Sequence, residues 1–160
     1  MAIEEMDLFP FTASADEDIS NLEYLPLFKE IAWDFIENKP VIDINTHEFV
    51  IVEGIEALKV WIYKTLLTER YAYEIYSDDY GNEVTRLVGK GYTRGYSESE
   101  ATRFDKESLM VNRYIYDVRK KEARFYDSTL DVTLIIDSVY GEVNINVRGY
   151  DSRISTRGDA

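Results

Sequence analysis

The most regular pattern of hydrophobic positions along the chain lies in residues 53–68. Ile55, Leu58, Ile62 and Leu66 recur at intervals of three and four residues. This spacing puts their side chains on one face of an α-helix. We therefore predict a helix over residues 53–68 that packs against the core.

Residues 117–150 alternate hydrophobic and polar side chains instead. Every second residue from Leu130 to Ile136 is apolar, and Val143, Ile145 and Val147 continue the alternation after a turn. A period of two is typical of strands that bury one face and expose the other. The sequence predicts a three-stranded antiparallel meander here.

Weaker patterns predict the remaining elements. Residues 30–52 alternate around turn residues and indicate a β-hairpin. A short helix is expected within residues 71–91, and another over residues 97–112, where Ser97 and Glu100 have capping-box spacing. The expected fold class is α+β: a small antiparallel sheet, made of the C-terminal meander and the N-terminal hairpin, packed with about three helices.

Charge divides the 160 residues into three parts: an acidic arm (1–24), a single domain (25–150) and a polar tail (151–160). The chain has 18 Lys and Arg against 31 Asp and Glu, and residues 1–24 contain seven acids and no base. This net charge of −13 argues against binding to nucleic acid, whose phosphates need a surplus of Lys and Arg. The arm is either a disordered tail or a segment that becomes ordered against a partner.

Composition also limits the chemistry. The chain has no cysteine and one histidine, His47, which excludes disulfides, thiolate nucleophiles and multi-histidine metal centres. Residues 78–83 lack the ligand spacing of an EF-hand, and residues 89–95 lack the Lys-Ser/Thr pair of a P-loop. We expect no cofactor, no metal and no catalytic residue. No run of about 18 apolar residues exists and no basic, apolar leader begins the chain, so we expect no membrane segment.

The last strand of the predicted meander has a neighbour on only one side in chain order. An exposed edge is either covered by a helix or an arm of the same chain, or used to accept a strand from another chain. The residue pattern alone leaves both possibilities open.

An ordered set of motifs resembles the sheath-initiator proteins of contractile tails, which belong to the baseplate wedges of phages and phage-like particles. Residues 52–71 match the family's helix followed by Thr-Glu-Arg, here Thr68-Glu69-Arg70. The resemblance covers roughly residues 28–150. The other matching motifs are Ile75-Tyr76-Ser77, Asp79-Tyr80-Gly81, Leu87-Val88-Gly89, Leu109-Met110-Val111-Asn112 and Tyr140-Gly141-Glu142-Val143.

The resemblance implies a small structural α+β protein, present in six copies around the tail hub, that joins the inner baseplate to the first ring of the sheath. It also implies that a terminal strand pairs with strands of the tail sheath subunits. The matching residues here are Glu142, Val143, Asn144, Ile145, Asn146, Val147, Arg148, Gly149 and Tyr150.

Contacts with baseplate wedge and hub or tube proteins are implied too. Related wedge proteins carry Glu-Pro-Arg at the start of the meander, and Glu122-Ala123-Arg124 matches this motif with alanine in place of proline. Glu122 and Arg124 would point to the same side of a strand and could contact one partner. Glu69 and Arg70 are further candidates. For Arg70 we favour a structural role, because the helix dipole favours a base at a helix C-terminus.

The function expected from this resemblance is structural and not enzymatic. It would place the protein in the tail baseplate of a virion or phage-like particle that is assembled in the cytoplasm of a bacterial host. The alternatives are a carboxylate-dependent, lysozyme-like glycoside hydrolase and a free-standing acidic module that binds a basic protein.

Overall fold

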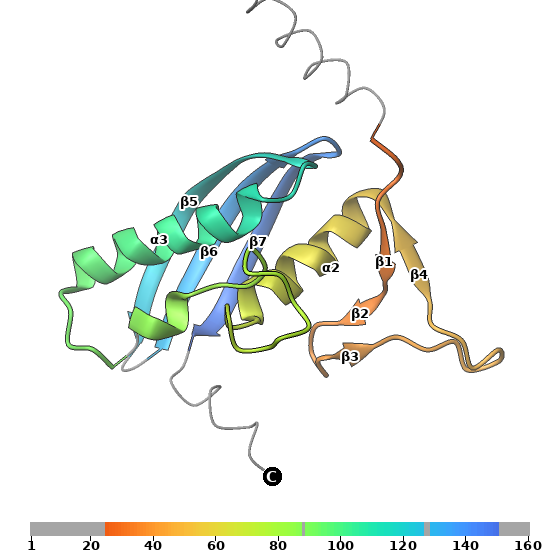
Figure 1. Cartoon of the computed structure of the whole chain (residues 1–160), viewed down its shortest axis with the longest axis horizontal. Helices are drawn as coiled ribbons and strands as arrows, with labels where there is room; N and C mark the ends of the chain where they lie inside the picture. The colour runs from red at the N-terminus through yellow and green to blue at the C-terminus, as the bar shows by residue number, and fades with distance from the viewer. Residues whose placement is uncertain (1–24, 88, 127–128, 151–160) are drawn as a thin grey trace, which may run out of the picture.

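The computed structural model of the chain describes residues 25–87, 89–126 and 129–150. These residues form two α-helices, one 3₁₀ helix and three small antiparallel sheets. Figure 1 shows the C-terminal sheet with α3 across one face, α2 beside it, and the N-terminal strands beyond α2. The mixed α+β class is thus confirmed. The predicted acidic arm and polar tail lie outside the described residues.

The predicted C-terminal meander is present. It consists of β5 (Ile115–Tyr126), β6 (Thr129–Ser138) and β7 (Gly141–Tyr150), in the order β5-β6-β7 and antiparallel throughout. Because side chains alternate across a strand, β6 directs every second residue into the core. Its fully buried apolar residues are Leu130, Val132, Leu134 and Ile136.

Both long helices cover the apolar face of this sheet. The first, α2 (Gly54–Leu67), matches the helix predicted over residues 53–68, and it buries Leu58, Ile62 and Leu66 as expected. It packs against β7, whereas α3 (Arg94–Met110) packs against β5. The two helices therefore hold the two outer strands from the same side.

The predicted start of the second long helix was wrong. Thr93 is its N-cap residue, and the Thr93 hydroxyl accepts a hydrogen bond from the backbone N–H of Tyr96 at 3.4 Å. Ser97 and Glu100, which have the spacing of a capping box, lie inside the helix, and Ser97 is buried. Threonine is also a good N-cap residue, so the helix begins one turn earlier than the capping box indicated.

The third predicted helix, within residues 71–91, is only the 3₁₀ helix η1 (Val84–Leu87). Gly81 and Gly89 on either side of it have positive φ angles of 101° and 76°. A segment this short between two such glycines cannot nucleate a stable α-helix, and a single 3₁₀ turn is the usual result.

The N-terminal hairpin predicted over residues 30–52 is divided into two sheets. β1 (Lys29–Ile31) pairs with β4 (Ile51–Glu53), and β2 (Trp33–Asp34) pairs with β3 (Lys39–Pro40). The division follows from a turn early in this segment. The carboxylate of Asp34 accepts hydrogen bonds from the backbone N–H groups of Ile36 and Glu37 and so reverses the chain there.

Three aromatic residues join the start of this N-terminal part to the sheet. The hydroxyl of Tyr140 accepts a hydrogen bond from the backbone N–H of Phe28 at 2.9 Å. The ring of Phe28 packs edge-on against Tyr114 with centroids 4.9 Å apart, and the Tyr114 hydroxyl donates to the carbonyl of Pro26 at 2.6 Å. The strands before α2 are therefore fixed to the β6–β7 end of the meander.

Candidate docking site

β7 lies at one edge of the C-terminal sheet. It pairs with β6 from Gly141 to Tyr150, with one irregularity in register, and no other strand among the described residues pairs with its second side. An edge strand presents unpaired backbone N–H and C=O groups along its length. The strand that the sequence suggested for docking is therefore an edge strand within the described residues.

The side chains of β7 fix how this edge is presented. Val143 and Val147 are fully buried in the core beneath the sheet, and Ile145 is partly buried against it. Glu142, Asn144 and Asn146 are exposed on the open face. Because a slip of one residue would expose the valines, the buried side chains lock the register of β7. The edge is thus rigid before any partner binds.

Three carboxylates lie side by side across the open face near the β6–β7 turn. Asp117 is opposite Asp137, and Asp137 is opposite Glu142. Arg119 contacts all three: its guanidinium nitrogens lie 2.8 Å from Asp137 Oδ2, 3.7 Å from Glu142 Oε2 and 3.9 Å from Asp117 Oδ2. Like charges in directly opposite positions repel one another. The turn end of β7 is therefore acidic, and the charge of Arg119 reduces the repulsion among the three carboxylates.

Lys106 of α3 also contacts this row. Its ammonium group donates a hydrogen bond to Asp117 Oδ1 at 2.7 Å, which links α3 to β5. This bond, together with the backbone N–H of Val118, holds the pKa of Asp117 below its usual range. The ionised form of Asp117 is therefore favoured although two other carboxylates are close by.

Glu122 and Arg124 lie on β5, at the opposite edge of the sheet from β7. Both side chains are exposed, and Arg124 Nε donates to Glu122 Oε1 at 2.6 Å, so the two side chains meet on one face. They are opposite Thr133 and Asp131 of β6, just beyond a register shift after Lys120. The sheet therefore offers a charged pair at one edge and an unpaired backbone at the other.

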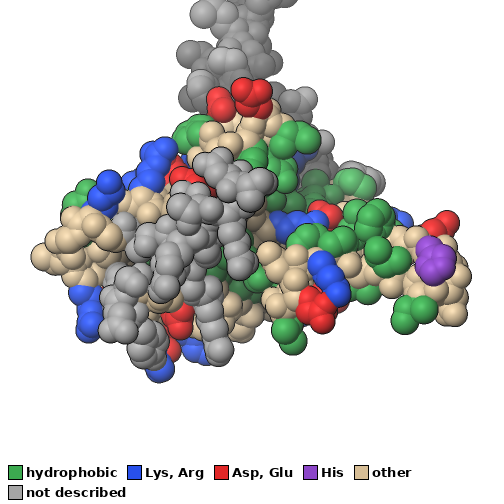
Figure 2. Space-filling model, turned by 90° about the horizontal axis from the view of Figure 1, so that it is seen from below, with side chains coloured by type: hydrophobic (Ala, Val, Ile, Leu, Met, Phe, Trp, Pro, Cys, Tyr) green, Lys and Arg blue, Asp and Glu red, His purple; other side chains and the backbone are tan. Residues whose placement is uncertain are grey.

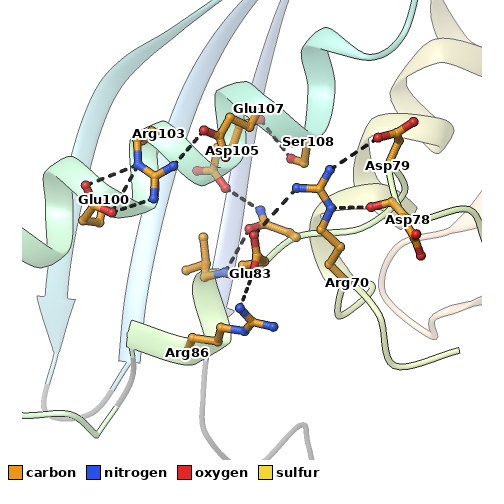
Figure 3. A network of polar contacts seen from close by, with 12 residues as sticks. Arg70, Asp78, Asp79, Glu83, Arg86, Glu100, Arg103, Asp105, Glu107 and Ser108 are labelled. Carbon is orange, nitrogen blue, oxygen red and sulfur yellow. Dashed lines mark hydrogen bonds and ion pairs between the residues drawn. The ribbon is translucent and has the colours of Figure 1, made fainter.

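Arg70, the second basic candidate, is directed into the protein. Its side chain is only 13% exposed, and its Nε donates to the backbone carbonyl of Asp78 at 2.7 Å (Figure 3). Its other nitrogens lie 3.7 Å from Glu83 and 4.0 Å from Asp79. These contacts fit a role in holding the loop after α2. Glu69 is half-buried beside it and forms a β-bridge with Asn82.

A buried polar network that the sequence did not reveal lies behind this loop. Asn82 Nδ2 donates to Asp105 Oδ1 at 2.6 Å, and Asn82 Oδ1 accepts from the backbone N–H of Val84 at 2.9 Å. The hydroxyl of Ser108 donates to the carbonyl of Asp105 at 2.9 Å (Figure 3). Asn82, Asp105 and Ser108 are all buried. The network ties the loop after α2 to the middle of α3.

One sequence signal could have indicated this network. The buried residues of α3 are mostly small or polar and recur at helical spacing; they are Ser97, Ala101, Asp105, Ser108 and Leu109. A search for apolar residues at helical spacing does not detect such a face, whereas a search for small residues at that spacing would have detected it.

Several features of the described residues bear on metal binding, ligand binding and membrane insertion. They include no group of three or more His, Asp or Glu side chains arranged to hold a metal ion. His47 lies exposed on a turn with a φ of 59°. An open groove of about 340 Å³ beside α2 has no Asp or Glu among its lining residues, which are Trp33, Asn38, Tyr63, Lys64, Leu67, Thr68, Tyr76 and Tyr80. In the part of the chain that is described, no helix has the length and apolarity needed to span a bilayer.

The fold and these surfaces define a small α+β protein with an edge strand at β7 and charged faces. Residues 29–141 match the family of contractile injection system sheath initiators, and the chain belongs to this family. It is 34% identical over 102 residues to the phage-like element PBSX protein XkdS of Bacillus subtilis (strain 168), a match that covers 58% of this chain and 72% of the relative.

This membership confirms the resemblance noted in the sequence. The chain is a sheath initiator of a contractile injection system, a structural class that interacts with tail sheath and baseplate components.

Proposed function

We propose that this protein joins the inner baseplate of a contractile particle to the first ring of the tail sheath, and that β7 templates the sheath by strand pairing. A sheath strand would add to the open edge of β7 at residues 142–150 and extend the meander to four strands. Backbone pairing of this kind gives affinity without requiring a particular side-chain sequence.

The observation that carries this proposal is the combination of an open edge with a locked register. A ten-residue strand with one unpaired side is a long edge, and natural proteins usually shorten, cover or charge such edges to prevent association. Here the register of the edge strand is fixed by Val143 and Val147, which are 1% exposed and pack in the core beneath it. Such a strand is suited to receive a partner in one defined register.

The wedge and hub contacts belong to the opposite edge in this proposal. Glu122 and Arg124 would face a wedge or hub protein, so that the sheet bridges two partners at once. Glu69 would contribute at the margin of this contact, while Arg70 holds the loop from within. The acidic arm, residues 1–24, would lie along a neighbour with a basic surface.

The assembly context follows from the same proposal. Six copies would surround the hub in the tail baseplate, and assembly would take place in the cytoplasm of the bacterial host. The protein would have no catalytic activity and would act only through its contacts with neighbouring proteins.

Hydrogen exchange tests the strand-pairing claim without altering the protein. The isolated chain is compared with the chain assembled with the sheath protein of its own gene cluster. We expect the amides of residues 142–147 whose N–H groups point away from β6 to exchange much more slowly after assembly, because a new strand would bond to them, while amides within α2 serve as the internal control. Unchanged exchange along β7 in the assembled state would contradict the claim.

A charge swap tests the role of the other edge. In the double variant Glu122→Lys/Arg124→Glu the two side chains can still pair with each other, but the new glutamate lies opposite Asp131 of β6, so we expect the free energy of unfolding to fall by up to about 1 kcal/mol. Incorporation into baseplates should nevertheless be lost, since the positions of the positive and negative charges that a partner would contact are exchanged. The matched control swaps Glu56 and Lys59, an exposed pair on α2 at 2.7 Å. Equal incorporation of both swapped proteins would rule out this interface.

A further inference from the structure

The N-terminal strands carry an apolar surface that the strand-pairing role does not use. Residues 33–51, here called the tongue, expose seven large hydrophobic side chains besides the half-buried Trp33 at their base. Ile36 and Ile44 are the extreme cases, with exposed fractions of 96% and 86%. The others are Phe35, Val41, Ile42, Phe49 and Ile51, the last of which begins β4 at the end of the tongue. Contiguous exposed apolar surface of this kind marks an interaction site.

The two isoleucines are held in place by their turns. The carboxylate of Asp34 accepts from the backbone N–H of Ile36 at 2.8 Å. The carboxylate of Asp43 accepts from the N–H groups of the two residues that follow Ile44, at 2.7 and 3.1 Å. The base of the tongue is fixed to α2, because the ring of Phe35 packs against Tyr63 with centroids 4.7 Å apart. The apolar tips are therefore presented on a defined scaffold and are not merely frayed.

The opposite end of the molecule has the complementary character. Residues 89–96, here called the glycine loop, connect η1 to the first turn of α3, and all eight are exposed. The loop contains Lys90 and Arg94 and no acid. Tyr92 and Tyr96 add an exposed aromatic pair with ring centroids 5.0 Å apart. Lysine and arginine next to aromatic rings suit an acidic, apolar partner.

The tongue is such a partner. It has four acids, Asp34, Glu37, Asp43 and Glu48, against the single base Lys39. Figure 1 shows the tongue and the glycine loop at opposite ends of the long axis. Figure 2 shows hydrophobic side chains around His47, the purple residue near the tip of the tongue, and Lys and Arg side chains at the other end.

We propose that the tongue of one copy docks onto the glycine loop of the next copy. Because the two surfaces differ and lie at opposite ends of the chain, the contact is head-to-tail and links copies into a ring or a row. The opposite charges would guide the encounter, and burial of the isoleucine tips against the tyrosines would stabilise it. This contact leaves the β7 edge free.

Cross-linking of single-cysteine variants tests the geometry, and it is clean because the chain has no cysteine of its own. Asn45→Cys protein is mixed with Gly95→Cys protein, which leaves Ile44, Tyr92 and Tyr96 intact, and treated with a short flexible bismaleimide. The control mixture pairs Asn45→Cys with Ile75→Cys, since Ile75 is 86% exposed but lies in the loop after α2. We expect the first pair to form dimers several-fold faster, and added salt to reduce the difference. Equal rates for both pairs would overturn the proposal.

Sedimentation of the full chain tests the same contact without a cross-linker. Wild-type protein should associate increasingly with concentration, whereas Ile36→Ser/Ile44→Ser and Lys90→Glu/Arg94→Glu proteins should each remain monomeric with unchanged melting temperatures. An equimolar mixture of the two variants should stop at dimers, because one intact tongue and one intact loop remain. Persistent association of either variant alone, or a wild-type chain that stays monomeric at every concentration, would contradict the proposal. The association of the isolated chain that this experiment measures does not depend on whether a sheath strand pairs with β7.

Discussion

A buried polar contact joins the loop after α2 to α3. Asn82 and Asp105 are 23 positions apart in sequence, and they meet at 2.6 Å in the interior. No local pattern connects two residues at that separation, so their pairing could not be predicted, although the helical spacing of small and polar residues in α3 marks the face that carries Asp105. The exposed pair of Glu122 and Arg124 could be anticipated, since residues two apart on a strand share a face.

Removing the amide of Asn82 tests how much the buried network contributes. Asn82→Ala deletes the donor to the Asp105 carboxylate and the acceptor for Val84 N–H. We expect the free energy of unfolding, measured by urea denaturation, to fall by about 2 kcal/mol, since two buried polar groups each lose a hydrogen-bond partner. The control Asn45→Ala, on an exposed turn, should change it by less than about 0.5 kcal/mol. A similar small change for both variants would show that the network is not important for stability.

At the scale of elements, regular apolar periodicity predicts helices and strands closely, whereas a capping motif alone does not predict where a helix begins. α2 and β6 were predicted closely because each buries a nearly continuous row of aliphatic side chains. The start of α3 was misplaced because its inner face is mostly small and polar, so the capping box was the only strong signal. The hairpin over residues 30–52 became two sheets because the Asp34 turn reverses the chain early.

Gly81 illustrates a constraint that comes from contacts between elements. Its φ is +101°, and an added Cβ would lie 2.9 Å from the Thr68 carbonyl oxygen and 3.0 Å from the backbone of Arg70. Gly81→Ala should therefore lower the free energy of unfolding by about 2 kcal/mol or more. Gly95→Ala is the matched control, because Gly95 is helical and a Cβ added there would meet no atom from outside its own helical turn within 4 Å. This change should be neutral or stabilising by up to about 1 kcal/mol. Comparable losses in thermal or urea unfolding of the two variants would contradict this reading.

At the scale of the whole molecule, the chain distributes its surfaces in different directions. The sheet has an open strand edge at β7 and a charged pair at β5 on the opposite edge. The tongue and the glycine loop lie at the two ends of the long axis (Figure 1). The role proposed here requires partners on different sides of the protein, and this separation would allow several contacts at once.

The most direct test of the central claim is a cryo-electron microscopy map of the baseplate–sheath junction in a particle that contains this protein. We predict a four-stranded sheet in which a strand of the sheath subunit runs beside residues 142–150 and forms hydrogen bonds with the side of β7 that faces away from β6. A map in which that edge of β7 is bare, or is covered by a wedge protein while the sheath attaches elsewhere, would contradict it.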